Sequence, residues 1–184
     1  MIKKFLLSTI IVLCCLASVN AQNKAKETSK LEDPDNLASQ YFSQVMGVAV
    51  DATSNVKLYK FIYEWIGTPY RFGGNTKNGI DCSAFTKAIY DKVFNTTILR
   101  NSRDIFSMVN PLLKDELKEG DLVFFKIKSK SITHIGIYLG DSRFAHASST
   151  RGVVISNLNE PYYSRYFYKG GRIIDGIKDD LVEE

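Results

Sequence analysis

The sequence predicts an α+β fold in which N-terminal helices pack on a C-terminal antiparallel β-sheet. Apolar residues recur at helical spacing in several stretches between residues 37 and 109. After Gly120 the pattern changes to short runs rich in β-branched and aromatic residues, each separated from the next by turn residues. Helices that precede the strands along the chain, rather than alternating with them, are typical of an α+β domain.

Residues 1–21 have the layout of a secretory signal peptide. Two lysines precede an apolar run from Phe5 to Leu16, and small residues lead to a predicted cleavage site after Ala21. A transmembrane anchor is one alternative, but the run is shorter than the ~20 residues needed to cross a bilayer. Lipid attachment at Cys14 or Cys15 is another, although neither cysteine follows a small residue. We therefore predict an exported protein with no stable membrane insertion after signal cleavage.

The rest of the chain is long enough for one domain with a hydrophobic core. Residues 22–55 predict a polar leader and a short helical extension, and residues 56–184 predict the main domain with an acidic C-terminal tail. The formal net charge of the whole chain is +4. This mild bias lacks the clustered basic patch of a nucleic-acid-binding protein, so we expect no nucleic-acid partner.

Apolar spacing and capping residues predict three helices. The first covers residues 37–66 and ends before Pro69, because proline cannot continue a helix. The second begins after Asp81, a residue type that caps helix N-termini, and contains the apolar stripe of DCSAFTKAIYDKVF. A shorter helix is predicted around SRDIFSMV, capped by Ser102 and closed by Pro111.

Five β-rich runs predict the strands of the sheet: DLVFFKI, THIGIYLG, RFAHAS, GVVISN and GRIIDGI. The second and third are adjacent and predict a hairpin that carries His134 and His146. In an antiparallel hairpin the residue numbers of every facing pair add up to the same value. His134 and His146 both have even numbers, so they lie on the same face only if that value is even. A two- or four-residue loop would place the histidines on opposite faces. We predict a loop of three or five residues near Gly140–Ser142, because joint action of the two histidines, considered below, needs them on one face.

The exported chain keeps a single cysteine, Cys82, because the other two lie in the signal peptide. It has no internal partner for a disulfide, and a free thiol outside the cell is open to oxidation. One interpretation is a buried cysteine that acts as a small apolar residue. The other is a nucleophile, because free N–H groups at a helix N-terminus and a neighbouring imidazolium lower a thiol pKa from its usual ~8.5.

The two histidines of the chain supply the other parts that a cysteine nucleophile needs. His134 is the candidate base, and His146 is the candidate group that orients the imidazole of His134. Both could instead be structural residues of the sheet. Together with Cys82 they could also bind zinc, but no CxxC or HxxxH pair and no fourth ligand is evident.

Four motifs together resemble the NlpC family of papain-like cell-wall cysteine peptidases. They are GTPYRFGG, DCSAF, EGDLVFF and THIGIYLGDSRFAHASS, and they occur in that family's order over roughly residues 56–175. The resemblance implies a papain-like version of the α+β fold. It implies no cofactor, and it implies peptidoglycan or its muropeptide fragments as the partner and substrate.

The resemblance also implies roles for individual residues. Cys82 matches the nucleophile, His134 the base, and His146 the polar residue that orients it. Tyr70 matches a tyrosine whose hydroxyl lies by the thiol and helps to stabilise the oxyanion. The backbone N–H of Cys82 would be the other donor to that oxyanion.

Three further residues match positions that bind substrate in related enzymes acting on short stem peptides. There, the counterparts of Asp81 and Ser83 hold the free amino terminus of an L-Ala, and the counterpart of Ser102 belongs to the same pocket. Asp81 can cap its helix at the same time. The chain departs from the family's pattern nearby, with Leu99 in place of a proline before Arg100 and with RDIF where a glutamine is usual. The resemblance therefore does not fix the shape of this side of the groove.

The function that these observations imply is an exported cysteine endopeptidase of peptidoglycan stem peptides, in the periplasm or secreted. The bond expected to be cut joins D-γ-glutamate to the diamino acid. One alternative is an endopeptidase of the same family that cuts the cross-link between stems. Others are an acyltransferase or amidase that uses the same thioester chemistry, and a wall-binding module without catalysis.

Overall fold

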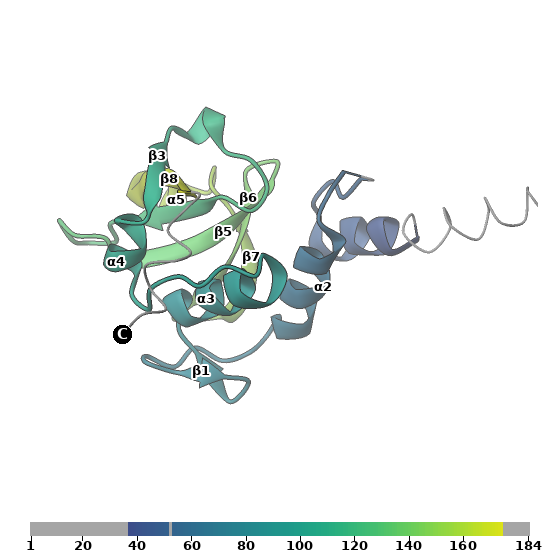
Figure 1. The fold of residues 1–184 in the computed structure, drawn as a ribbon, viewed down its shortest axis with the longest axis horizontal. Coiled ribbons are helices and arrows are strands. Elements are labelled where there is room, and N and C mark those ends of the chain that lie inside the picture. Colours follow the sequence, from purple (N-terminus) through teal and green to yellow (C-terminus); the bar gives the residue numbers. More distant parts are fainter. Residues whose placement is uncertain (1–36, 52, 175–184) are drawn as a thin grey trace, which may run out of the picture.

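The computed structural model describes residues 37–51 and 53–174 of the chain (Figure 1). The predicted signal peptide, the polar leader up to residue 36 and the acidic tail from residue 175 lie outside the described residues. Residues 37–46 are helical, and the elements that follow have these bounds: α2 Val56–Trp65, β1 Asn75–Thr76, β2 Gly79–Ile80, α3 Cys82–Val93, α4 Ser102–Phe106, β3 Val109–Leu112, the 3-10 helix η1 Lys114–Glu116, β4 Leu122–Phe125, β5 His134–Gly140, β6 Arg143–Ser148, β7 Gly152–Asn157, α5 Pro161–Tyr166 and β8 Phe167–Ile173.

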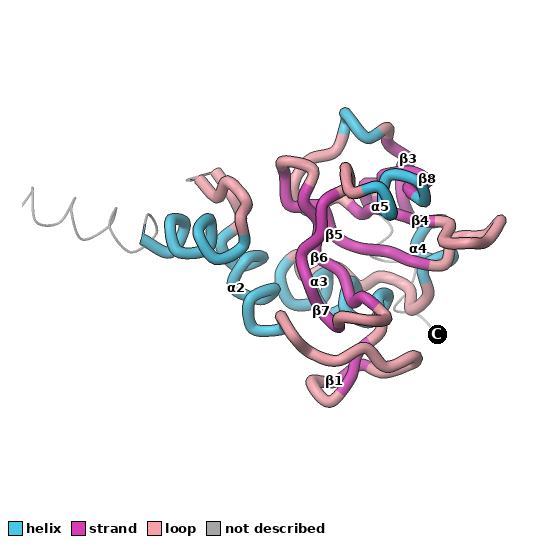
Figure 2. Tube along the Cα trace, turned by 180° about the vertical axis from the view of Figure 1, so that it is seen from behind, coloured by secondary structure: helices cyan, strands magenta, loops and turns pink. Residues whose placement is uncertain are grey.

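The centre of the fold is a six-stranded sheet with the strand order β3-β8-β4-β5-β6-β7 (Figure 2). Every neighbouring pair in it is antiparallel. Most of the helices precede the sheet along the chain, so the predicted α+β class is confirmed. In the described part of the chain, no helix combines the length and the apolar character needed to cross a bilayer.

The two faces of the sheet are covered differently. The alternate residues Ile135 and Ile137 point to the face against which α3 packs, and there they join the main hydrophobic core with α2. On the other face a smaller cluster contains Val123, Phe125 and Phe144, covered by Tyr163 of α5. The two histidines lie on this second face, and their rings pack against Phe125 and Phe144.

The first predicted helix is two helices rather than one. The helix of residues 37–46 ends at Gly47, whose φ of +62° is a left-handed conformation that glycine adopts without strain. The chain then turns and α2 begins after Asn55, whose side chain accepts a hydrogen bond from the N–H of Leu58 at 3.3 Å. Buried Phe42 and Met46 join the same core as α2, so this extension packs on the main domain.

The helix α3 begins as predicted, with Asp81 accepting a hydrogen bond from the N–H of Ala84 at 2.8 Å. The predicted cap of α4 is wrong. Asn101 caps it by accepting from the N–H groups of Arg103 and Asp104, and Ser102 is its first helical residue. Pro111 does not close this helix but lies in β3 at the edge of the sheet, where a residue without an N–H removes no internal ladder bond.

The predicted length of the loop between β5 and β6 is wrong, but the two histidines share a face as expected. Gly140 faces Arg143, so only Asp141 and Ser142 form the turn. With this turn alone, the numbers of facing residues would add up to an odd value. A β-bulge between Tyr138 and Gly140 inserts one extra residue, so that Tyr138 faces Phe144 and the numbers add up to an even value. The histidines therefore share a face. The sequence pattern also missed β3, the short β1–β2 hairpin and α5.

Candidate active site

Cys82 is the first residue of α3 and its side chain is 7% exposed. The N–H of Ile135, at the start of β5, interacts with the thiol, so the sulfur lies beside the peptide that follows His134. Burial raises the pKa of the Cys82 thiol to about 11, and the N–H groups of Ile135, Ser83 and Cys82 itself only partly offset this. The expected lowering of this pKa is therefore absent, because burial outweighs the helix N-terminus. The free protein holds a neutral thiol at pH 7.

The two histidines form a hydrogen-bonded pair. His134 Nε2 lies 2.8 Å from His146 Nδ1, with the rings nearly perpendicular at 86°. Burial lowers the pKa of His134 to about 4. Burial, and then the neighbouring His134 and Arg151, hold the pKa of His146 well below its ordinary value. Both imidazoles are therefore neutral at pH 7, and Nδ1 of His134 is left for other partners.

The far nitrogen of His146 meets a buried cluster of hydroxyl groups. Its Nε2 lies 3.1 Å from Ser156 Oγ and 3.1 Å from Tyr163 OH. Arg151 donates from Nη2 to both oxygens, at 3.0 and 3.3 Å. Sequence reasoning missed these three residues. Alternation in GVVISN puts Ser156 on the face of His146 and was a usable signal for it, whereas Arg151 lies in a turn with no periodic pattern.

Gly136 makes room for the histidine pair. It faces His146 across the hairpin, and a Cβ built at Gly136 would lie 3.1 Å from the Cβ of His146 and 2.8 Å from both the carbonyl oxygen of Ala145 and a ring carbon of Phe144. Any side chain here would push the imidazole or the strand away. The observed position of His146 therefore requires a glycine at residue 136.

Tyr70 is held beside the thiol by a loop that is fastened to β7. Gly67 N–H donates to the carbonyl of Val153, and Val153 N–H donates to the carbonyl of Thr68, each at 2.9 Å. Gly152 permits this contact, because a Cβ at that position would collide with the carbonyl oxygen of Thr68. Burial raises the pKa of Tyr70, as do the neighbouring Cys82 and Asp81. The phenol hydroxyl therefore stays protonated and available as a donor.

Two hollows meet at these residues. The larger, about 450 Å³, is lined by Cys82, Asp81, Ser83 and Ser102 among others. The smaller, about 230 Å³, is lined by His134, His146, Ser148, Tyr162 and Tyr163 among others. Tyr70 and Thr133 line both, so the two hollows adjoin, and we call them together the groove. The structure thus brings together all seven residues singled out in the sequence.

Asp81 and Ser83 are already engaged within the protein. Arg100 holds the Asp81 carboxylate through two hydrogen bonds, Nη1 to Oδ1 at 2.8 Å and Nη2 to Oδ2 at 2.9 Å. It also donates to Ser83 Oγ at 2.7 Å. The pKa of Asp81 is lowered because these hydrogen bonds and the N–H groups of Ala84 and Gly73 outweigh the opposing effect of burial.

Comparison with known proteins identifies the family of this site. The sequence profile of the NlpC/P60 family matches residues 67–172, more than half of the chain. The chain belongs to the NlpC/P60 family. The family expected from the sequence is therefore confirmed, and the match includes every residue of the groove named above.

Similar proteins carry peptidase names. A "Probable endopeptidase NlpC homolog" of Haemophilus influenzae is 43% identical over 111 residues, which are 60% of this chain and 58% of that protein. The "Murein DD-endopeptidase MepS/Murein LD-carboxypeptidase" of Escherichia coli K12 is 33% identical over 167 residues, 90% of this chain and 87% of that protein. A crystal structure of an NlpC/P60 family protein from Bacillus cereus matches with a TM-score of 0.59 and 30% identity, over 68% of this chain and 42% of that one.

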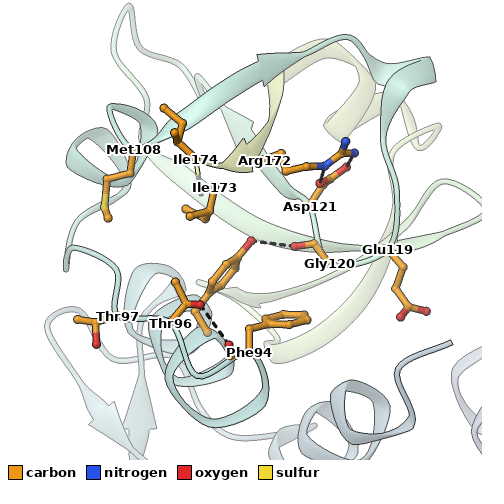
Figure 3. A pocket seen from close by; sticks show the side chains of 11 residues that line it. Phe94, Thr96, Thr97, Met108, Glu119, Gly120, Asp121, Arg172, Ile173 and Ile174 are labelled. Carbon is orange, nitrogen blue, oxygen red and sulfur yellow. Dashed lines mark hydrogen bonds and ion pairs between the residues drawn. The ribbon is translucent and has the colours of Figure 1, made fainter. Parts of the chain in front are cut away.

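A third cavity of the NlpC/P60 domain, about 240 Å³, lies apart from the groove, between the end of α3 and strand β8 (Figure 3). Two of its three charged side chains form an ion pair, since Arg172 donates to both carboxylate oxygens of Asp121 at 2.8 and 2.7 Å. The third, Glu119, accepts hydrogen bonds from the Asn55 N–H and the Tyr59 hydroxyl. The Tyr90 hydroxyl donates to the carbonyl of Gly120 at 2.9 Å. None of the seven candidate site residues lines it.

The zinc interpretation finds no support in the described residues. Within residues 37–51 and 53–174, no three or more His, Cys, Asp or Glu side chains are grouped so that they could hold a metal ion. Nδ1 of His146 bonds to His134 and its Nε2 to the hydroxyl cluster. Both ring nitrogens of His146 are therefore already engaged within the described residues.

Proposed function

We propose that this protein is an exported cysteine endopeptidase that hydrolyses the stem peptides of peptidoglycan, in the periplasm or secreted. The observation that carries the proposal is the joining of Cys82, at a helix N-terminus, to the His134–His146 pair along one groove. The names of the relatives from H. influenzae and E. coli support it. The signal peptide that export requires is proposed from residues 1–21.

Cys82 is the proposed nucleophile and His134 the proposed base. As Sγ forms a bond to the scissile carbonyl carbon, the thiol proton passes to Nδ1 of His134. His134 then gives this proton to the departing amine as the C–N bond breaks. Water attacks the thioester, gives a proton to His134, and the acid product leaves as the proton returns to Sγ. Attack starts from a neutral pair, as the shifted pKa values of both groups require.

His146 is the proposed orienting residue. When His134 holds a second proton, its Nε2–H must donate to Nδ1 of His146, 2.8 Å away. The proton of His146 must then be on Nε2, where it can be donated to Ser156 Oγ or Tyr163 OH. The hydroxyl cluster can therefore accept the proton of the tautomer that a catalytic imidazolium needs.

Tyr70 and the N–H of Cys82 are the proposed donors to the oxyanion of the tetrahedral intermediate. Both belong to the larger hollow, and Tyr70 remains protonated because its pKa is raised. Asp81, Ser83 and Ser102 line the same hollow and are proposed to face the bound stem peptide. No cofactor takes part in this scheme.

The bond we propose is the one between D-γ-glutamate and the diamino acid. A second candidate is the cross-link between neighbouring stems, which the name of the E. coli relative favours because it describes a murein DD-endopeptidase. Acyl transfer to an amine would use the same thioester, and a non-catalytic wall-binding module would need neither the thiol nor the histidines.

The test is mass spectrometry of defined muropeptides after incubation with the wild type and with Cys82→Ala. The set contains free stems, sugar-linked stems and cross-linked dimers, with and without a primary amine as acceptor. We expect hydrolysis that Cys82→Ala abolishes, while circular dichroism shows the variant to be folded. Amine adducts in place of hydrolysis products would indicate a transferase. Binding without any turnover would leave a wall-binding module.

A further inference from the structure

Arg151 contacts the end of the histidine pair that is remote from the thiol. It lies in the turn between β6 and β7, and its Nη2 donates to Ser156 Oγ at 3.0 Å and to Tyr163 OH at 3.3 Å. Each of these oxygens lies 3.1 Å from His146 Nε2. Only one hydroxyl oxygen therefore separates the guanidinium from the imidazole of His146, and the proposed mechanism gives Arg151 no part.

The charge of Arg151 is not neutralised by an ion pair. Arg100 and Arg172 are each paired with an aspartate, whereas none of the ion pairs among the described residues includes Arg151. Within residues 37–51 and 53–174, no carboxylate side chain lines the hollow beside the histidines. Arg151 is exposed, so water weakens its field at His146 without cancelling it.

The other ionisable side chains that line the groove come from α5, α4, the start of α3 and the loop before it: Tyr162, Tyr163, Arg103, Cys82, Asp81 and Tyr70. Burial raises the pKa of Cys82 and of Tyr70, so both are neutral at pH 7. Asp81 is paired with Arg100, and Arg103 lines the hollow of the thiol and not that of the histidines. The charge that acts on the His146 end of the pair is therefore that of Arg151.

Once the pair has taken up a proton, its positive charge can be at either end. His134 Nδ1 and His146 Nε2 then both carry hydrogen, and a third proton lies in the 2.8 Å bond between His134 Nε2 and His146 Nδ1. With this middle proton on His134, that ring is an imidazolium and its Nδ1–H is a strong acid. With the proton on His146, His134 is a neutral imidazole and a weak acid. The two states differ only by one proton transfer across one hydrogen bond.

A fixed positive charge beside His146 separates these two states in energy. Coulomb repulsion falls with distance, so the guanidinium raises the energy of an imidazolium at His146 more than that of one at His134. Burial, then His134 and then Arg151 hold the pKa of His146 well below its ordinary value. The nearby cation thus acts in the same direction as the geometry.

We propose that Arg151 is a positioning residue that holds the shared proton of the histidine pair on His134, where it can protonate the departing amine. The inference rests on the proposed function and deepens it by adding a residue that controls the general acid. Arg151 is not among the described residues that line the groove, so it acts through Ser156, Tyr163 and His146.

The first test follows the proton and needs no turnover. The chain contains two histidines, both in the pair, so Cys82→Ala protein without a histidine tag gives imidazole nitrogen signals in NMR from these side chains alone. His146→Gln in the same background assigns them. We expect His134 to become an imidazolium before His146 as the pH falls from 7 towards 4, while circular dichroism shows a folded protein. The reverse order would overturn the inference.

The second test removes the charge. Arg151→Met keeps a long side chain without the cation, Arg151→Lys keeps the cation, and Arg165→Met removes a charge from α5, where Arg165 lies over the ring of Tyr166. In Arg151→Met we expect His146 to share the first proton and the titration of the pair to move up by about 0.5–1 pH unit. Arg151→Lys and Arg165→Met should titrate like the parent protein. An unchanged titration in a folded Arg151→Met variant would overturn the inference.

The third test varies the need for a general acid. One substrate is a stem peptide with the scissile amide, and the other is the same acyl group as a nitrophenyl ester, whose phenolate leaves without a proton. Arg151→Met should lower kcat/KM for the amide by about threefold to tenfold and leave that for the ester within about twofold. Arg151→Lys should restore most of the loss. Equal losses for both substrates would indicate a structural role and overturn the inference.

Failure of the proposed function gives a different result from failure of this inference. Protein that cleaves neither substrate, but in which His134 still takes the first proton, would overturn the peptidase and retain the placement of the proton by Arg151. Cleavage of both substrates, with the first proton on His146, would retain the peptidase and overturn the role of Arg151. If Arg151→Met does not fold, the order of titration with Arg151 in place decides. If acid unfolds the protein before the histidines titrate, the comparison of amide and ester at neutral pH decides.

Discussion

Two buried aspartates, each held by an arginine, lie at two places in this domain. Asp81 with Arg100 borders the groove of Cys82, and Asp121 with Arg172 borders the third cavity. The pairs are alike in their own geometry, because both are bidentate and the arginines are 43% and 46% exposed. Their neighbours differ. Asp81 also binds a helix start and a loop, whereas Asp121 also binds the N–H of Lys118 in a turn.

The difference teaches that the surroundings of an ion pair, and not the pair itself, decide what it does. The pair at Asp121 fastens the start of β4 to β8. The pair at Asp81 fixes the residues on both sides of the thiol. The two sites also differ in the charge of their ionisable groups. Burial keeps Cys82, His134 and His146 neutral beside the groove, whereas the third cavity contains the ion pair of Asp121 and Arg172.

The largest expected effect concerns the thiol. With a pKa of about 11, Cys82 should react with iodoacetamide at pH 7 roughly 300-fold more slowly than a cysteine of ordinary pKa. The rate should rise with pH up to that pKa. Alkylation followed by mass spectrometry against free cysteine checks this. A reaction as fast as that of free cysteine would mean that a thiolate–imidazolium pair is already present.

The next effect is on stability in acid. The pKa of His134 is about 4 in the folded protein and near 6.5 when unfolded, so the unfolded chain takes up the proton first. The contribution of His134 should be complete above pH 6.5 and fall by about 3 kcal/mol as pH drops to 4. His146, whose pKa is also held low, should add to the loss in the same direction. Denaturant titrations at several pH values measure it. His134→Gln should lose less over this window, and Arg172→Gln should behave like the wild type.

The two aspartates provide a matched pair of variants. Asp81→Asn should lower kcat/KM by at least about tenfold, because loosened contacts to the loop and to the start of α3 displace the thiol. Asp121→Asn should leave kcat/KM within about twofold. Both should reduce the free energy of unfolding by about 1–3 kcal/mol, a modest loss because water reaches both arginines. Equal losses of activity would remove the distinction between the two pairs.

Two buried tyrosines give the smallest contrast. Tyr163→Phe removes a hydroxyl from His146, and Tyr90→Phe removes one from the carbonyl of Gly120. Each should destabilise the fold by about 1 kcal/mol. Only Tyr163→Phe should lower kcat, by up to about tenfold, with KM unchanged, because it removes one of the two acceptors available to the Nε2 proton of His146. An unchanged kcat would mean that Ser156 alone is sufficient to accept the Nε2 proton of His146.

The parts of the site that the sequence predicted are those fixed by local rules. The capping of α3 by Asp81 needs only the next three residues of the chain, and alternation along β5 separates His134 from the core residues Ile135 and Ile137. The shared face of the two histidines depends in addition on the bulge, which no pattern in the sequence indicated. The groove residues were assigned through motifs. Each of these patterns lies within a short stretch of sequence, so it can be recognised without knowledge of the fold.

The parts that the sequence missed depend on distant contacts. Arg100 reaches Asp81 across 19 positions of the chain, and no periodic pattern connects them. Arg151 lies in a turn and becomes part of the site only when α5 brings Tyr163 to it. The raised pKa of Cys82 is likewise a tertiary effect, because burial by the packed sheet exceeds the local influence of the helix N-terminus.

The bulge beside Gly140 has a consequence for insertions and deletions. Surface turns usually tolerate changes of length, but here the two-residue turn and one extra strand residue jointly set the parity of β6. Losing one residue at the bulge, with the same turn, would rotate His146 into the apolar core and Ala145 and Ala147 onto the face of His134. Tags, grafts or natural length variants at Asp141–Ser142 should therefore be accepted in steps of two residues, and a single-residue change should silence the enzyme without touching a catalytic side chain.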